Sequence, residues 1–192
     1  MQVTPQELPE VLEIAPRKFG DARGFFSETY NAMKFADAGI LSVFVQDNHS
    51  FSATRGVLRG LHYQLPPFAQ DKLVRVTKGA IFDVAVDIRQ GSPTFAKWCA
   101  RIITSQAWNQ LFIPKGFAHG FLTLEPDTEV IYKVSNIYAP EYECSIHYSD
   151  PELAIDWPLD QIEPLLSAKD SVAPLLKDQP DLFLYAGKGT NP

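Results

Sequence analysis

The chain has 192 residues, 45% of them hydrophobic, and a formal net charge of −6 at pH 7. This length is enough for one domain with a substantial buried core, and the composition excludes an intrinsically disordered protein. The acidic balance, without any long basic run, argues against nucleic-acid binding, although a few well-placed arginines or lysines are enough to bind a small anion.

The sequence shows neither a signal-peptide pattern nor an apolar run long enough to cross a bilayer, so we expect a cytoplasmic protein that does not bind membranes. Cys99 and Cys144 are the only cysteines, and they have no CxxC spacing. We therefore expect two free thiols in a reducing compartment, and neither a disulfide nor a zinc site.

One helix is predicted over residues 32–38, because Asn31 suits an N-cap and Gly39 suits the left-handed residue that follows a helix. Most of the remainder alternates or is rich in β-branched and aromatic residues, as in short strands separated by turns. The predicted strands are Leu41–Val45, Val57–Tyr63, Lys72–Thr77, Ala80–Ile88, Trp98–Ile103, Leu111–Ile113, Gly120–Leu124 and Glu129–Val134.

This spacing of strands favours a β-sandwich or jelly-roll barrel over repeated βαβ units. We expect a single domain over residues 1–192, with N-terminal strands in residues 1–40 and the barrel core in roughly residues 40–150. From Pro151 onward prolines and aspartates become frequent and the alternation fades. Residues 151–192 are therefore predicted to form a tail with short helices that packs on the barrel.

Two polar residues are predicted to face the barrel interior, because each shares a strand face with two valines. These residues are Lys72 and Tyr132. An inward lysine needs an anion or a water-filled cavity, since burying it unpaired is costly. An inward tyrosine is more often a core residue, and only a histidine across a cavity would favour a role as an acid.

The most informative stretch is Arg59-Gly60-Leu61-His62-Tyr63-Gln64, followed by Lys72. It offers a proton acceptor and two cations, the groups needed to remove a proton beside a carbonyl and hold the resulting enolate. The alternative is that His62 and Lys72 are ordinary strand residues. Alternation puts Arg59 and His62 on opposite faces, so both reach one pocket only if Gly60 bends or bulges the strand.

A second motif is the Pro-x-Gly-x-x-His spacing of Pro114, Gly116 and His119, which resembles the second motif of the cupin superfamily. Metal-binding cupins also carry a His-x-His pair, whereas the corresponding segment here reads His62-Tyr63-Gln64. With one imidazole missing and Lys72 nearby, the sequence argues against a bound metal.

Together these motifs resemble the dTDP-4-dehydrorhamnose 3,5-epimerase family, and the matching segments are Gly20–Glu28, Phe44–Ser50, Arg55–Gln64, Lys72–Val76, Phe82–Arg89, Ile113–Phe121 and Leu166–Asp170. The resemblance implies a mainly β, cupin-type jelly roll and a homodimer that exchanges N-terminal strands. It also implies an isomerase that uses no metal or cofactor. The implied substrate is dTDP-4-dehydro-6-deoxyglucose, which is epimerised at C3 and C5, on either side of the C4 ketone.

The resemblance further implies a role for individual residues. His62 would be the base and Asp170 its carboxylate partner, while Lys72 would stabilise the enolate and Tyr132 would return a proton to the opposite face. The implied binding residues are Arg23, Arg59 and Lys169 for the diphosphate or neighbouring oxygens, Glu28, Gln46, Asp47, Asn48, His119 and Glu143 for the nucleotide and sugar, and Tyr138 with the Phe25-Phe26 pair for packing on the thymine or sugar.

Three alternatives remain at this stage. An enzyme that epimerises only C3 or only C5, as in antibiotic-sugar pathways, could use the same base, lysine and tyrosine. A non-catalytic nucleotide-sugar-binding cupin is disfavoured because a binder has no need of both an acid and a base. A metal-dependent cupin oxygenase or isomerase is disfavoured by the missing His-x-His pair.

Overall fold

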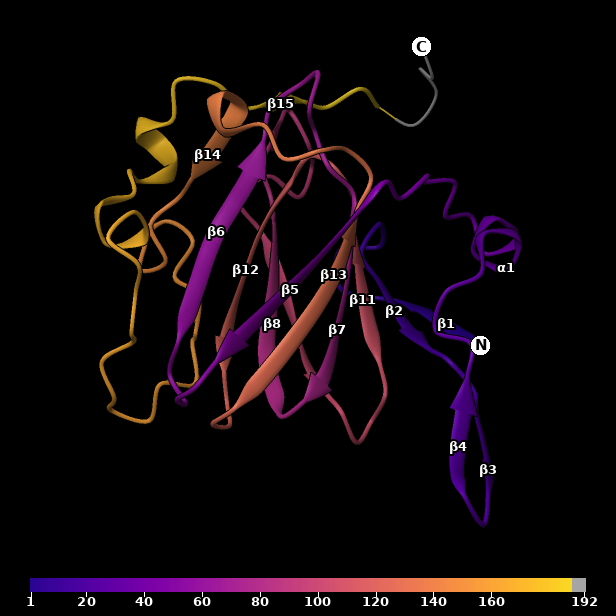
Figure 1. Ribbon diagram of the computed structural model, residues 1–192. Coiled ribbons are helices and arrows are strands. Elements are labelled where there is room, and N and C mark those ends of the chain that lie inside the picture. Colours follow the sequence, from indigo (N-terminus) through magenta and orange to yellow (C-terminus); the bar gives the residue numbers. More distant parts are fainter. Residues whose placement is uncertain (188–192) are drawn as a thin grey trace.

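The computed structural model describes residues 1–187, and its framework consists of two β-sheets packed face to face (Figure 1). The larger sheet contains, in spatial order, β1 (Gln2–Pro5), β2 (Leu12–Ala15), β11 (Gln110–Ile113), β7 (Lys72–Lys78), β13 (Thr128–Val134) and β5 (Gln46–Ser52). The smaller sheet contains β10 (Trp98–Thr104), β8 (Ala80–Asp87), β12 (Phe117–Thr123), β6 (Leu58–Gln64) and β14 (Glu143–Ser145). The predicted β-sandwich architecture is confirmed.

The remaining elements are short. They are the hairpin of β3 (Lys18–Asp21) and β4 (Gly24–Ser27), the parallel pair β9 (Arg89–Gln90) and β15 (Phe183–Leu184), the helix α1 (Ala32–Asp37), and the 3₁₀ helices η1 (Pro140–Tyr142), η2 (Asp170–Val172) and η3 (Leu176–Asp178). The predicted helix is confirmed, since the Asn31 side chain accepts hydrogen bonds from two backbone N–H groups of the first turn. Residues 188–192 of the predicted tail lie outside the described residues.

One predicted strand is wrong. Residues Leu41–Val45 form no regular structure, and the strand of this region is β5, which begins at Gln46. Leu41 and Val43 are exposed, whereas β5 buries small polar side chains on alternate positions. Residues 41–45 are therefore apolar but irregular, whereas the strand that follows carries polar residues on both of its faces. The other seven predicted strands are found with ends shifted by at most a few residues.

The interior of the sandwich is an apolar cluster to which β7, β8, β10, β11, β12 and β13 contribute. Val74 and Val76 are buried in it, as is Val130 on the neighbouring strand β13. Tyr132 packs against the same cluster and lies directly opposite Val74 in the strand register. The predicted inward orientation of Lys72 and Tyr132 is confirmed, because each shares a face with these valines.

A β-bulge on β6 brings polar residues to the interior. His119 of β12 pairs with His62, but Phe121 pairs with Arg59, so β6 has one more residue than β12 between these two pairs. The extra residue is accommodated at Gly60, whose φ is +121°. A Cβ there would lie 2.5 Å from Gly120 Cα, so only glycine allows the two strands to come this close. The predicted bulge is confirmed.

The outer face of the smaller sheet is covered by the tail. Phe82 packs edge to face on Trp157, and Leu153 and Leu176 complete a second apolar cluster there. Polar anchors fix the tail as well, since the Tyr63 hydroxyl donates to Gln179 Oε1 at 2.9 Å. The tail is thus an integral layer of the structure that runs past the end of β6.

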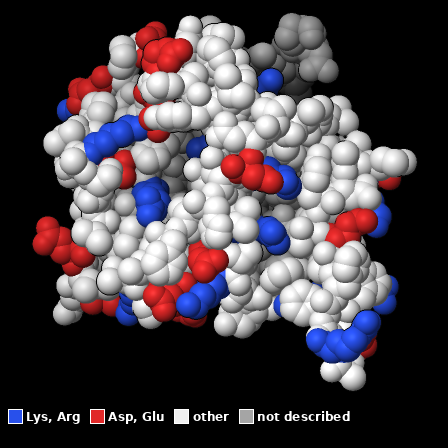
Figure 2. Space-filling view, viewed as in Figure 1, with Lys and Arg blue, Asp and Glu red and all other residues white. Residues whose placement is uncertain are grey.

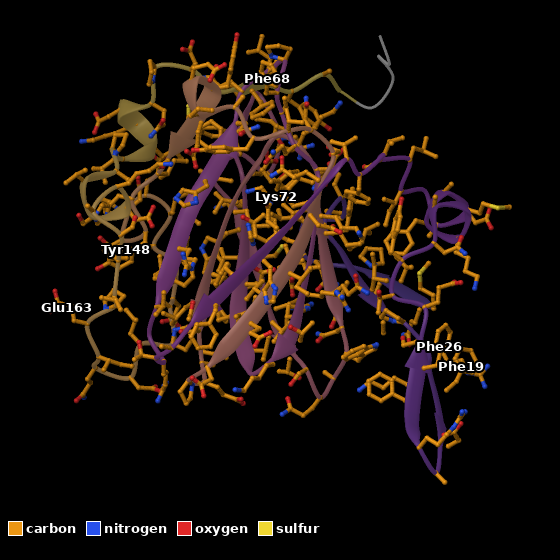
Figure 3. The ribbon with its side chains drawn as sticks, in the orientation of Figure 1. Phe19, Phe26, Phe68, Lys72, Tyr148 and Glu163 are labelled. Atoms are coloured by element: carbon orange, nitrogen blue, oxygen red, sulfur yellow. The ribbon has the colours of Figure 1, made fainter. Side chains whose placement is uncertain are left out.

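The hairpin formed by β3 and β4 projects away from the barrel (Figure 1). Phe19 and Phe26 stand on it with 51% and 70% of their surfaces exposed, and both are seen at the edge of the molecule in Figure 3. Within residues 1–187, no helix has the length and apolarity needed to cross a membrane.

Candidate active site

The sandwich encloses a cavity of about 210 Å³ at one end. Figure 2 shows the corresponding face hollowed between β6 and β13, with acidic and basic side chains next to one another around the hollow. Several of the predicted site residues line this cavity, from five strands and the loop that follows β13. They are His62, Lys72, Tyr132, Gln46, Asn48, Tyr138 and Glu143.

His62 forms a short pair with the tail. Its Nε2 lies 2.6 Å from Oδ1 of Asp170, whose side chain is almost fully buried. The Ser167 hydroxyl donates to the other carboxylate oxygen at 2.8 Å. Burial disfavours ionisation of Asp170, but the hydrogen bonds from His62 and Ser167 outweigh it and hold its pKa below the ordinary value. The carboxylate therefore faces an N–H at Nε2.

That contact fixes which nitrogen of His62 is free. With the proton held at Nε2 by Asp170, Nδ1 has its lone pair available, and among residues 1–187 no group hydrogen-bonds to it. The ring is partly exposed and lines the cavity. His62 is thus arranged as a base whose Nδ1 can accept a proton from a molecule bound in the cavity.

Lys72 lies inside the barrel (Figure 3) and is 9% exposed. Its Nζ donates to the backbone carbonyl of His62 at 3.3 Å, and it forms no ion pair with any residue that the structure describes. Burial lowers its pKa to about 8, while the charges of Asp83 and Glu143 favour the protonated form. The result is an ammonium group without a direct anionic partner, located beside the base.

Tyr132 extends into the cavity from β13. Burial raises the pKa of its hydroxyl, and the nearby charge of Arg59 opposes that increase. Arg59 itself donates to the carbonyl of Phe51 at 3.3 Å and is exposed, outside the set of residues that line the cavity. The bulge at Gly60 therefore brings Arg59 and His62 to the same side of β6, as predicted.

A connected set of polar groups forms the rim. The Tyr138 hydroxyl donates to Glu143 Oε2 at 2.7 Å, and Lys169 Nζ lies 2.6 Å from the same oxygen. The backbone N–H of Tyr138 donates to Gln46 Oε1, and the Gln46 amide donates to Asn48. The five predicted binding residues named here are thus brought together at one edge of the cavity.

Other predicted binding residues lie elsewhere in the chain. Asp47 is on the outer face of β5, where it pairs with Lys133 at 2.8 Å. His119 lies on β12 opposite His62, buried below the cavity lining. Arg23, Phe26 and Glu28 belong to the projecting hairpin and the segment after it, outside their own cavity.

Sequence reasoning missed three residues of this region. Gln64 and Gln70 line the cavity, and the Gln64 amide accepts from the Ala139 N–H at 2.9 Å, so it holds the loop that carries Tyr138. Asp83 is fully buried and pairs with His119 at 2.6 Å. An acid on a strand ordinarily indicates a face turned to solvent, so no sequence signal places Asp83 inside.

Within the described part of the chain, no group of three or more histidine, cysteine, aspartate or glutamate side chains is placed to hold a metal ion. At the position of a cupin metal, the Gln64 amide is bound to backbone groups and the Lys72 ammonium lies beside His62, so these residues do not form a ligand set.

Comparison with known proteins gives a consistent assignment. Residues 5–178 match the family described as dTDP-4-dehydrorhamnose 3,5-epimerase. An enzyme of that name from Pseudomonas aeruginosa is 54% identical over 171 residues, which cover 88% of this chain and 93% of the relative. An enzyme of the same name from Mycobacterium tuberculosis is 40% identical over 180 residues, which cover 93% of this chain and 89% of the relative.

Solved structures agree with this assignment. A dTDP-6-deoxy-D-glucose-3,5-epimerase from Legionella pneumophila, in complex with dTDP-4-keto-L-rhamnose, superimposes with a TM-score of 0.91 at 48% identity, covering 96% of this chain and 98% of its own. A 3′-monoepimerase from Streptomyces bikiniensis, in complex with dTDP-quinovose, gives 0.83 at 36% identity, covering 90% and 87%. The fold is accordingly a cupin-type jelly roll, and the chain is an isomerase that belongs to the dTDP-4-dehydrorhamnose 3,5-epimerase family.

Proposed function

We propose that this chain epimerises C3 and C5 of dTDP-4-dehydro-6-deoxyglucose to give dTDP-4-dehydro-rhamnose, with His62, Asp170, Lys72 and Tyr132 as the catalytic residues. The observation that carries the proposal is the grouping of a free imidazole nitrogen, an ammonium without an anionic partner and a half-buried phenol around one cavity. Base, enolate stabiliser and acid are the groups that inversion beside a ketone requires.

In the first half of the reaction, Nδ1 of His62 removes the proton from C3 or C5. The C–H bonding pair moves into the C–C bond toward C4, and the ketone π electrons move onto the C4 oxygen. Asp170 stabilises the imidazolium that forms, because its carboxylate accepts the Nε2–H at 2.6 Å. The Lys72 ammonium stabilises the enolate oxygen, where negative charge develops in a site largely screened from water.

In the second half, the Tyr132 hydroxyl gives its proton to the same carbon from the opposite face. The C4 ketone reforms and the configuration at the carbon is inverted. The His62 imidazolium then releases its proton to solvent and the Tyr132 phenolate regains one, which restores both groups for the second carbon. Tyr132 is suited to this donation because its raised pKa keeps the hydroxyl protonated at neutral pH. A base and an acid from different strands reach the two faces of the sugar ring, since His62 is on β6 and Tyr132 on β13.

The rim residues would hold the nucleotide. Arg59 and Lys169 supply positive charge for the diphosphate, and the exposed ring of Tyr138 offers a stacking surface for thymine. Because Lys169 pairs with Glu143 in the structure, diphosphate binding would compete with that ion pair. We assign the hydrogen bonds to the sugar and base to Gln46, Asn48 and Glu143, which line the cavity. Asp47 faces away from the cavity and His119 is buried behind its lining, so neither of these two predicted binding residues is assigned a contact with the substrate.

We further propose that the protein is a homodimer in which the hairpin of one subunit completes the cavity of the other, so that Arg23, Phe26 and Glu28 contact the partner's substrate. This is supported by the hairpin's projection away from its own barrel (Figure 1) and by its exposed phenylalanines. The Arg23 side chain is 90% exposed, and among residues 1–187 its one ion pair is with Asp21 of the same hairpin. An isolated two-stranded hairpin with such a surface requires a partner for stability.

Mixing two inactive variants tests this arrangement. One subunit carries Arg23→Ala and the other carries His62→Asn. If the hairpins are exchanged, one of the two cavities of this heterodimer has both native residues; if each hairpin serves its own cavity, neither cavity does. Refolding equimolar variants together should therefore restore about a quarter of the native activity, because half of the dimers have one intact cavity of two. Absence of restored activity, with heterodimers present in a native mass spectrum, would exclude exchange.

The competing function is epimerisation at one carbon, since the 3′-monoepimerase shares the fold. The identity to double epimerases reaches 54%, against 36% to the monoepimerase, which favours two carbons. Proton NMR of the 4-dehydro-6-deoxy substrate in D₂O tests the proposal directly. Loss of both the C3 and C5 signals, with rhamnose formed once a reductase and NADPH are added, is expected. Loss at one carbon would support the monoepimerase, and no exchange would contradict both.

Two further expectations belong to the same proposal. Residues 1–192 act as a single epimerase domain. This is supported by the cavity, whose lining residues come from both sheets, and by Asp170 of the tail, which pairs with the base His62. The protein functions in the cytoplasm, which is supported by its two free cysteines.

A further inference from the structure

Asp83 occupies an unusual position for an acid. It lies on the face of β8 that also carries Ile81 and Ala85, both members of the interior apolar cluster. Its exposed surface is 0%. Because an ionised carboxylate in such surroundings is costly, its presence calls for compensating positive charge or hydrogen bonds.

Only one of the two carboxylate oxygens of Asp83 accepts a hydrogen bond from a described residue. Oδ1 lies 2.6 Å from Nε2 of His119, which is itself buried. Oδ2 has no hydrogen-bond partner among the described residues. Burial lowers the pKa of His119, so this imidazole is neutral at pH 7 and donates one N–H without adding a charge. The positive charge that compensates Asp83 must therefore come from another group.

Lys72 is the cation that meets this requirement. Its Nζ donates to the carbonyl of His62, and His62 pairs across the sheet with His119, the residue that binds Asp83. Lys72 is buried there, and Asp83 is the foremost charge that favours its protonated form. Glu143 at the rim also favours it, and Lys169 opposes it. His62 and His119 face the same region, and Tyr132 extends from β13. No described residue forms an ion pair with Lys72, so Asp83 acts on the ammonium through space, and the N–H groups that do not donate to the His62 carbonyl are left for the substrate.

We propose that Asp83 is a positioning residue for the epimerase reaction: it keeps Lys72 in the ammonium form beneath the substrate's C4 oxygen, and His119 fixes the carboxylate in place. This inference rests on the role proposed for Lys72. A carboxylate in direct contact would compete with the enolate for the N–H groups of Lys72, whereas one removed by a layer sustains the charge and leaves those groups to the substrate.

Asp83→Asn tests the inference, because the amide oxygen can still accept from His119 while the negative charge is lost. The Lys72 side chain is titrated by ¹³C NMR at Cε, assigned with a Lys72→Arg variant, in the absence of substrate. The native midpoint is expected at about 8. In Asp83→Asn it should fall, and a shift of one pH unit would lower the ammonium fraction at pH 8 about fivefold. The upper pH limit of C3 and C5 exchange should move by the same interval.

Asp87→Asn is the matched control. Asp87 is on the same strand and equally buried, but its carboxylate is bound by Arg89, Ser92 and Thr94. This variant should lose stability and leave the Lys72 titration unchanged. If the midpoint of Lys72 is the same in Asp83→Asn as in the native protein, the inference is overturned.

A measurement on the native protein covers the case in which Asp83→Asn does not fold. The ¹³C shift of the Asp83 carboxyl at pH 7 should be that of an ionised group, and a protonated carboxyl would overturn the inference. These titrations also separate it from the proposed function. A Lys72→Met variant that still exchanges protons would contradict the role of Lys72 in turnover, whereas the coupling between Asp83 and Lys72 is read without any substrate.

Discussion

His62 and Asp170 are separated by 108 residues in the sequence, yet Nε2 of the imidazole and Oδ1 of the carboxylate lie 2.6 Å apart. The histidine stands on a central strand of the barrel, and the aspartate begins a 3₁₀ helix of the tail. Asp150 fastens the tail nearby by accepting the backbone N–H of Leu176 at 2.6 Å. The base of the proposed reaction is thus assembled from two layers, and its free nitrogen depends on how the tail is docked.

Replacement of Asp170 by asparagine should slow proton exchange by roughly 10²–10⁴-fold, because the amide can accept the Nε2–H but does not stabilise the imidazolium. Single-turnover exchange in D₂O measures the effect. Ser167→Ala, which removes a hydrogen bond from the other oxygen of Asp170, is the control and should have a much smaller effect. Equal losses in both variants would mean that tail geometry, and not the charge of Asp170, controls the rate.

Replacement of His62 by asparagine should abolish exchange at both C3 and C5, because one base serves both carbons. Binding of dTDP should remain nearly intact, since the ring lies away from the rim residues assigned to the nucleotide. Calorimetric titration with dTDP measures binding, and NMR measures exchange. Appreciable residual turnover would show that a second base operates.

Replacement of Tyr132 by phenylalanine should impair inversion more than exchange. His62 can still remove the proton and return a deuteron to the same face, whereas delivery to the opposite face is lost. The ratio of inverted product to exchanged substrate, measured by NMR in D₂O, should therefore fall. A parallel loss of exchange and inversion would exclude a role for Tyr132 as a simple acid.

The sequence predicts most of the framework, because strands that bury valines and isoleucines have a strong alternation signal. Strand β5 was missed because its inward residues, among them Asn48 and Ser50, are polar and face a cavity, while the apolar Val43 before it is exposed. The bulge at Gly60 was expected because alternation alone would place Arg59 and His62 on opposite faces of the strand, whereas one pocket needs both side chains. The pairing of His62 with Asp170 came only from family resemblance, since no local pattern indicates which tail residue returns to the barrel.

The proposed role of Lys72 predicts a pH dependence. Its pKa is lowered from 10.5 to about 8, so the ammonium that stabilises the enolate is lost as the pH rises through that value. The rate of exchange should fall above pH 8. The free energy of unfolding should rise between pH 8 and 10.5. In this window Lys72 is protonated in the unfolded chain but not in the folded one, so raising the pH favours the folded state.

Lys72→Arg separates these effects, because a guanidinium stays protonated throughout this range. The fall in exchange rate above pH 8 should disappear in this variant, even if its maximal rate is lower. If the fall persists unchanged, another group titrates, and the assignment of the upper pH limit to Lys72 is wrong.

Gly60→Ala should disable the site through the backbone. Gly60 has a φ of +121°, and an added Cβ would lie 2.5 Å from Gly120 Cα and 2.7 Å from the His119 carbonyl oxygen. Because both contacts are with backbone of the paired strand, β6 must move away from β12, carrying Arg59 and His62 with it. We expect a loss of about 3 kcal/mol or more in unfolding free energy, together with loss of exchange activity.

Gly39→Ala isolates the contribution of backbone strain from that of steric contact. Gly39 follows the helix with a φ of +86°, and a Cβ there would have no neighbour within 4 Å. This variant should lose only about 1 kcal/mol, with exchange activity retained. Denaturant unfolding gives the two free energies, and NMR gives the two exchange rates. If Gly60→Ala is as active as Gly39→Ala, then close approach of β6 and β12 is not needed to bring Arg59 and His62 to one cavity, and the bulge is a feature of packing alone.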